Sequence, residues 1–195
     1  MVQTEVEICN MALSRLGETN ITSLTDTTKE AQQCELFFDQ TRDEVLRDYD
    51  WNFAMGRVEV SPLSGDTFSP FEYKYQLPND CLKVICPIDI ASESYQDLRE
   101  DFLVEGRMLL TNLTPCAIRY TKKITNPTYY DSLFVECLAL KLASKIAFNL
   151  TGDRNTEINM LNQYLAQLPE AKAIDGGESR NRKKKKKYWD EYRSR

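Results

Sequence analysis

The chain has 195 residues, of which 42% are hydrophobic and 28% charged, a composition typical of one soluble globular domain of ordinary size. Its apolar runs, such as residues 137–140, are too short to cross a bilayer, and residues 1–7 lack the basic and apolar regions of a secretory signal. We therefore expect a protein that is made and folded in a cytosol, without a membrane span.

Charge is distributed unevenly along the chain. Residues 180–195 contain nine Lys/Arg and two Asp/Glu, whereas the remaining 179 residues contain 16 Lys/Arg and 28 Asp/Glu. An acidic body of net charge about −12 therefore carries a basic end of about +7. Such a segment is typical of chains that bind an acidic protein surface or a nucleic acid.

Cysteine and histidine usage limits the chemistry that we expect. There is no histidine and no C-x-x-C pair, so the common zinc sites are improbable and the commonest general base is missing. The cysteines are scattered among apolar neighbours, which in a reducing compartment predicts free, buried thiols. They are Cys9, Cys34, Cys81, Cys86, Cys116 and Cys137.

Adjacent carboxylates are the remaining candidates for acid–base catalysis. They are Asp43-Glu44, Glu100-Asp101 and Asp190-Glu191. Neighbouring carboxylates on a helix or strand mostly point apart into solvent, so we interpret them as surface charge. The sequence predicts no enzyme, no cofactor and no metal site.

Two helices are expected in the first 50 residues. Residues 4–16 repeat apolar side chains at helical spacing, and Gly17 supplies a stop. The second helix is predicted to begin near Thr27, where Thr27 and Glu30 fit a capping box, and to end at about Asp48. Its apolar face is predicted to comprise Ala31, Cys34, Phe38, Thr41 and Val45.

Large aromatic residues follow this helix directly. Trp51 and Phe53 stand in the run Trp-Asn-Phe-Ala. We interpret them as a structural anchor in the core, where the helix meets a sheet. A contact with another subunit is the alternative.

Residues 57–125 are predicted to form an inserted β subdomain. Short segments alternate apolar and charged residues, as at Val58 and Val60, and Gly106 suits a hairpin turn. Prolines punctuate the segments, which indicates a small sheet or a partial barrel. These prolines are Pro62, Pro70, Pro78, Pro87 and Pro115.

Helices return at residues 126–174. Residues 133–150 are apolar on nearly all sides, which predicts a central buried helix that Gly152 ends. A last helix is predicted to end at Pro169, with residues 175–179 as a flexible linker. Its expected apolar stripe is Ile158, Leu161, Leu165 and Leu168.

The basic end is the most distinctive segment. A solvated, disordered end is one interpretation, and a segment that becomes ordered on a partner is the other. Interleaved aromatics favour the second, because aromatics and arginine anchor interfaces. The candidate partner-binding residues are Arg180, Arg182, Lys183, Lys184, Lys185, Lys186, Lys187, Tyr188, Trp189 and Tyr192.

The expected fold is therefore α+β, mainly α. Residues 1–56 and 126–174 would form a helical bundle, residues 57–125 the inserted β subdomain, and residues 175–195 a linker and an extended basic aromatic tail.

Several short stretches occur in a fixed order along the chain. They are residues 9–17 (CNMALSRLG), 21–26 (ITSLTD), Ala31, Cys34, 42–43 (RD), 46–47 (LR), 51–54 (WNFA), 75–82 (YQLPNDCL), 104–107 (VEGR), 118–120 (IRY) and 133–139 (LFVECLA). Taken together, they resemble the tail tubular protein A family, also called head-to-tail adaptors, of short-tailed phages. The resemblance covers about residues 5–150 and does not extend to the basic tail.

The resemblance implies a non-enzymatic virion protein of the tail or neck, assembled in the host cytoplasm. Members form a twelve-fold ring between the portal protein and the tail nozzle protein, with a helical bundle, a β subdomain and a central DNA channel. An acidic body suits such a channel, because negative walls repel the phosphate backbone and let DNA slide during ejection without specific binding.

Two other classes of function remain open. One is a nucleic-acid-binding protein that acts through residues 183–187, for which a salt-dependent DNA shift lost on deleting residues 180–195 would be diagnostic. The other is a tail-associated peptidoglycan hydrolase, which a zymogram would reveal.

Overall fold

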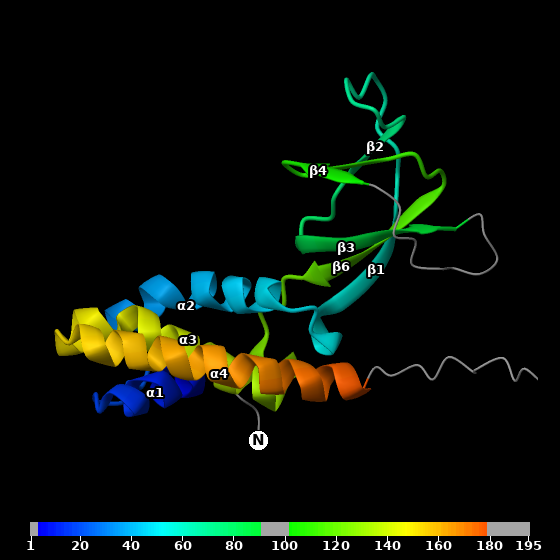
Figure 1. Cartoon of the computed structure of the whole chain (residues 1–195). Helices are drawn as coiled ribbons and strands as arrows, with labels where there is room; N and C mark the ends of the chain where they lie inside the picture. The colour runs from blue at the N-terminus through cyan, green and yellow to red at the C-terminus, as the bar shows by residue number, and fades with distance from the viewer. Residues whose placement is uncertain (1–3, 91–101, 179–195) are drawn as a thin grey trace, which may run out of the picture.

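Four α helices and six strands make up the part of the chain that the computed structural model describes, residues 4–90 and 102–178. The helices pack side by side into an elongated body, and the strands rise from one end of it (Figure 1). The fold class is α+β and mainly α, as the sequence predicts. The basic tail, residues 179–195, lies outside the described residues.

Helix α1, Glu5–Leu16, confirms the first predicted helix. Thr4 caps it by accepting a hydrogen bond from the Glu7 amide, and the Glu7 carboxylate accepts one from the Thr4 amide. This reciprocal capping box was not expected from the sequence. Gly17 ends the helix in the left-handed region, at φ 74, which glycine adopts without steric cost.

Helix α2, Lys29–Asp48, begins one residue later than the predicted capping box requires. Thr28, and not Thr27, is the N-cap, and its hydroxyl accepts from the Ala31 amide at 3.3 Å. The box at Thr27 and Glu30 is wrong because Thr28 is the extended residue directly before the helix, at φ −71 and ψ 154. The predicted apolar face is buried in full, and Arg42 and Leu46 are buried with it.

The strands form two three-stranded antiparallel sheets instead of one sheet or a partial barrel. One sheet has the order β1-β6-β3 and the other the order β2-β5-β4, so β3 and β4 both lie at sheet edges. Gly106 makes the turn between β4 and β5 at φ 57, as predicted. The strands are β1 Met55–Val60, β2 Tyr73–Gln76, β3 Cys81–Asp89, β4 Leu103–Glu105, β5 Met108–Thr111 and β6 Cys116–Lys122.

Pro87 does not interrupt its segment, contrary to the prediction. It lies inside β3, in register with Ile118 of β6. Because β3 is an edge strand, the missing amide proton of a proline is tolerated there.

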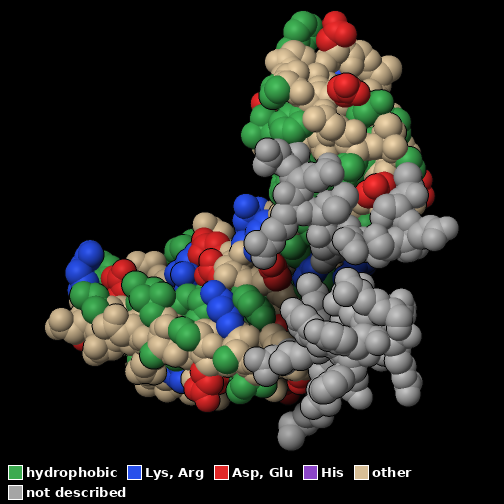
Figure 2. Space-filling model, turned by 45° about the vertical axis from the view of Figure 1, so that its right-hand side comes forward, with side chains coloured by type: hydrophobic (Ala, Val, Ile, Leu, Met, Phe, Trp, Pro, Cys, Tyr) green, Lys and Arg blue, Asp and Glu red, His purple; other side chains and the backbone are tan. Residues whose placement is uncertain are grey.

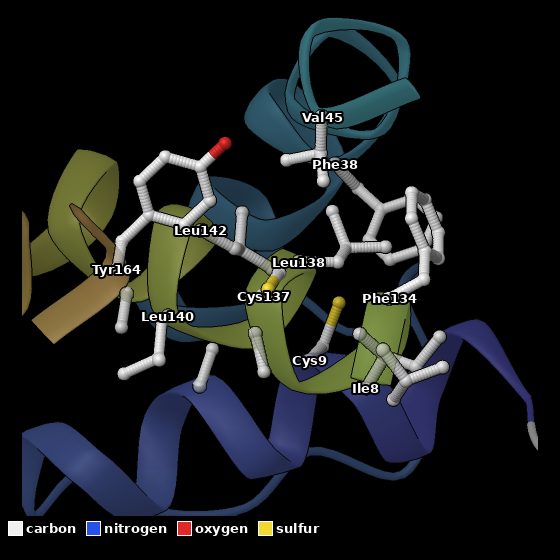
Figure 3. Packing of buried hydrophobic residues seen from close by; sticks show 14 of the residues in the cluster. Ile8, Cys9, Phe38, Val45, Phe134, Cys137, Leu138, Leu140, Leu142 and Tyr164 are labelled. Carbon is white, nitrogen blue, oxygen red and sulfur yellow. The ribbon is translucent and has the colours of Figure 1, made fainter. Parts of the chain in front are cut away.

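Helix α3, Ser132–Thr151, is the central helix that the sequence predicts. It contacts α1, α2 and α4, and Figure 3 shows Phe134 and Leu138 in the packed interior between the helices. Asp131 caps its start and Gly152 ends it at φ 72. A helix that is apolar on most sides is stable here because three neighbours cover it.

Helix α4, Arg154–Glu178, corrects three predictions. It continues through Pro169, and residues 175–178 are helical and do not form a linker. Of the predicted stripe, Leu168 is buried, but Ile158, Leu161 and Leu165 are 49%, 38% and 55% exposed. The buried side chains of α4 are Met160, Tyr164, Leu168, Ala171 and Asp175.

Packing explains why α4 does not end at Pro169. A proline inside a helix removes one backbone hydrogen bond and costs about 3 kcal/mol. Leu168 and Ala171, on either side of it, are buried in the helical core, and Asp175 forms polar contacts one turn later. These contacts, on both sides of the proline, offset that cost.

Candidate interaction site at the helix–sheet junction

The predicted partner-binding residues, Arg180 to Tyr192, lie outside the described residues. The structure does describe the point from which that segment continues, which is the end of α4. This end lies beside the segment that joins α2 to β1 (Figure 1), and the residues of that junction form the candidate interaction site.

The predicted structural anchor occupies the centre of the junction. Trp51 has no exposed surface, and its indole Nε1 donates to the Val45 carbonyl at 2.9 Å. Its ring meets Phe134 edge-on with centroids 5.3 Å apart, and Phe53 meets Phe134 at 5.0 Å. Both aromatics therefore contact α3 inside the helical core, and no other subunit is needed to cover Trp51.

The last turns of α4 are tied to the residues around Trp51. The Asn52 amide donates to the Asp175 carboxylate at 3.2 Å, and the Asn52 side-chain amide donates to the Asp175 carbonyl at 2.6 Å. The Tyr49 hydroxyl donates to the Lys172 carbonyl at 3.2 Å. The basic tail thus continues from a fixed point on the junction.

Asp175 is the charged residue that sequence reasoning missed here. It is only 4% exposed, and burial raises the pKa of its carboxyl group, with the nearby Asp131 carboxylate adding to the rise. Its place one turn beyond Ala171 on the buried face of α4 could have identified it. The two glycines that follow it instead indicated a linker.

A polar joint connects the helical body to the sheets. Lys83 of β3 pairs with Asp50 at 2.5 Å, and Lys123, directly after β6, pairs with Asp43 of α2 at 2.8 Å. Asp43 also binds the buried Arg42 guanidinium at 2.8 Å. We call Asp43, Asp50, Lys83 and Lys123 the polar joint.

The described carboxylate pair that could have served in catalysis has structural partners. Asp43 binds Arg42 and Lys123, and Glu44 accepts from Lys145 at 2.5 Å. The other two pairs, at residues 100–101 and 190–191, lie outside the described residues.

All six cysteines are free thiols, and Cys81 is the one that is not fully buried. The Cys9 thiol is hydrogen-bonded to Cys34 and buried, and both effects raise the pKa of Cys9 well above its usual value. An apolar environment of this kind keeps a thiol protonated and unreactive.

Neither a metal site nor a membrane span is found in the described part of the chain. Within residues 4–90 and 102–178, no group of three or more Cys, Asp or Glu side chains could hold a metal ion. None of the helices in these ranges combines the length and the apolar character that crossing a bilayer requires.

No protein-family model matches the chain, and a search of curated proteins likewise gives no match.

Proposed function

We propose that the chain is a structural, non-enzymatic subunit of a phage head-to-tail adaptor ring, which joins the portal to the tail nozzle and lines the DNA channel. The observation that carries the proposal is the packing of the resembling stretches. Residues 9–17, 51–54 and 133–139 are far apart in sequence, yet they contribute side chains to one hydrophobic core. An ordered set of motifs that shares a core is better explained by a common fold than by chance.

The finer architecture belongs to this proposal. The four helices would be the bundle of the adaptor and residues 57–125 its inserted β subdomain. Residues 179–195 would be the basic tail, now shortened by four residues that belong to α4.

Charge gives further support. The chain without its last 16 residues has a net charge of about −12. A ring of such subunits would surround DNA with negative potential, and this lowers the affinity of the wall for phosphate.

Exposed apolar side chains offer surfaces for neighbouring subunits. Ile158, Leu161 and Leu165 lie three and four residues apart on α4 and are all exposed. Figure 2 shows several hydrophobic patches on the visible face of the helical body. Patches of this kind on a soluble protein commonly mark sites of association.

Negative-stain microscopy of the purified chain mixed with the portal protein from the same source tests the proposal. We expect an added layer of density on one face of the portal ring, with the rotational symmetry of that ring. An extended filament or a two-fold dimer as the sole form, with bare portal rings, would contradict it.

A further inference from the structure

A cleft lies where the end of α2 meets the two sheet edges. It has a volume of about 410 Å³. Figure 2 shows basic side chains in this region, where the helical body meets the sheets. The lining residues come from α2, β3, the end of β2 and the β4–β5 hairpin, and they are Arg47, Leu77, Cys81, Leu82, Lys83, Val84, Val104, Gly106 and Arg107.

The cleft contains two arginines that form no ion pair within the described part of the chain. Arg47 donates to the Leu82 carbonyl and Arg107 to the Pro78 carbonyl, so backbone oxygens hold both guanidinium groups in place. Lys83 is paired with Asp50, but no carboxylate among the described residues forms an ion pair with Arg47 or Arg107. Each fork keeps further N–H donors for a ligand.

Both guanidinium groups line the same cleft as Cys81. Burial raises the pKa of the Cys81 thiol, Arg107 and Arg47 act to lower it, and the Asp80 carboxylate acts to raise it. Two arginines held around one opening favour a carboxylate, which their planar forks can bind with paired hydrogen bonds.

The rest of the wall suits an extended peptide. Leu82 and Val84 are partly buried, Val104 is 41% exposed, and together they supply apolar surface next to the buried Leu77. Both β3 and β4 are edge strands, and an edge strand offers backbone groups to which another strand can pair.

We propose that this cleft binds an extended segment of a partner protein in which acidic residues alternate with apolar ones. Carboxylates of the segment bind Arg47 and Arg107, and its apolar side chains pack on the leucine and valine wall. DNA is the less suitable anion, because a body of net charge about −12 repels a polyanion more strongly than a short segment with a few charges. The proposal goes beyond the adaptor function and does not depend on it.

The probe is a fluorescent eight-residue peptide of alternating glutamate and valine, compared with its glutamine counterpart by fluorescence anisotropy on the full chain. We expect the glutamate peptide to bind about tenfold more tightly, as charge-assisted hydrogen bonds imply. We also expect it to slow the modification of Cys81 by a thiol reagent, because that sulfur lies in the cleft.

The variant Arg47→Gln/Arg107→Gln is expected to lose this preference, whereas Arg57→Gln, which removes an exposed charge on β1, is expected to keep it. The comparison of the two peptides on the unaltered chain stands even if the double variant folds poorly. Equal binding of both peptides would overturn the proposal. So would binding of a DNA oligonucleotide, in place of the peptide, that the double variant abolishes.

Discussion

Asp175 is a buried carboxylate that ties α4 to the segment after α2. Its side chain is almost fully covered and accepts a hydrogen bond from the Asn52 amide, 123 residues away in sequence. A carboxylate in this place bears a desolvation cost, which raises its pKa. The hydrogen bonds between Asp175 and Asn52 offset that cost.

Replacing Asp175 tests this balance. We expect Asp175→Ala to lower the free energy of unfolding by about 1–3 kcal/mol, because the Asn52 amide loses its acceptor. Asp175→Asn keeps an acceptor oxygen and removes the charge, so its stability at neutral pH should equal or exceed that of the unaltered chain. Chemical denaturation of the three proteins measures the free energy of unfolding. Equal stability of the alanine and asparagine variants would contradict this expectation.

The same residue predicts a pH dependence. Because the pKa of Asp175 is raised in the folded state, the folded chain binds this proton more tightly than the unfolded chain does. The stability of the unaltered chain relative to Asp175→Asn should therefore rise as the pH falls through the raised pKa, down to the ordinary value of 3.8. A constant difference between the two proteins across that window would show that Asp175 titrates normally.

Thiol reactivity provides a further test at single residues. We expect a thiol reagent to modify all six cysteines after denaturation without reductant, since all are free. In the folded chain Cys81 should react first, because the other five are buried. Mass spectrometry of the labelled chain identifies the sites, and a protected pair after denaturation would show that a disulfide forms.

At the scale of elements, the sequence predicts those features of the helices that depend on residues close together in the chain. Helix α3 is apolar on nearly all sides, so its central position follows from the sequence. The ends of α1 and α3 follow from Gly17 and Gly152, which adopt left-handed conformations. The pattern is less informative at the start of α2, where two adjacent threonines compete for the cap.

Long-range contacts explain most of what the sequence did not reveal. Pro169 and the glycines after Asp175 are local stop signals, but packing on α3 and hydrogen bonds with Asn52 override them. The basic cleft was equally hidden, because Arg47 and Arg107 come together only when β3 and the β4–β5 hairpin are placed. A local pattern contains no such information.

The polar joint is expected to set the angle between the body and the sheets more than the stability. Its lysines are partly exposed, so each ion pair contributes about 0–1 kcal/mol. We expect Lys83→Met/Lys123→Met to unfold at nearly the same temperature as the unaltered chain, but to give a broader pair-distance distribution in small-angle X-ray scattering. Lys29→Met, an exposed charge at the start of α2, is the control. Identical scattering from all three proteins would mean that apolar contacts alone fix the angle between the helical body and the sheets.

At the scale of the whole molecule, the chain is strongly polarised. An acidic body ends in a basic aromatic segment, and α4 delivers that segment at the junction of helices and sheets. If the subunits form a ring, each copy presents its tail at an equivalent position. Many weak tail contacts then act together, and linked contacts of this kind raise the overall affinity well above that of one contact.

Truncation tests the role of the tail. A cut after Ile174, which the sequence alone suggests, would also remove Asp175 and its bonds to Asn52, so the cut must follow Glu178.

We expect the chain of residues 1–178 to fold normally and to bind portal rings more weakly than the full chain at physiological salt. The reason is that positive charge would steer the tail to an acidic portal surface, and Tyr188, Trp189 and Tyr192 would add apolar area that charge alone does not supply. A variant with Tyr188, Trp189 and Tyr192 changed to serine separates the two contributions, because it retains the charge. If the truncated chain joins portal rings as tightly as the full chain, the tail is not a portal contact, and binding of DNA becomes its better explanation.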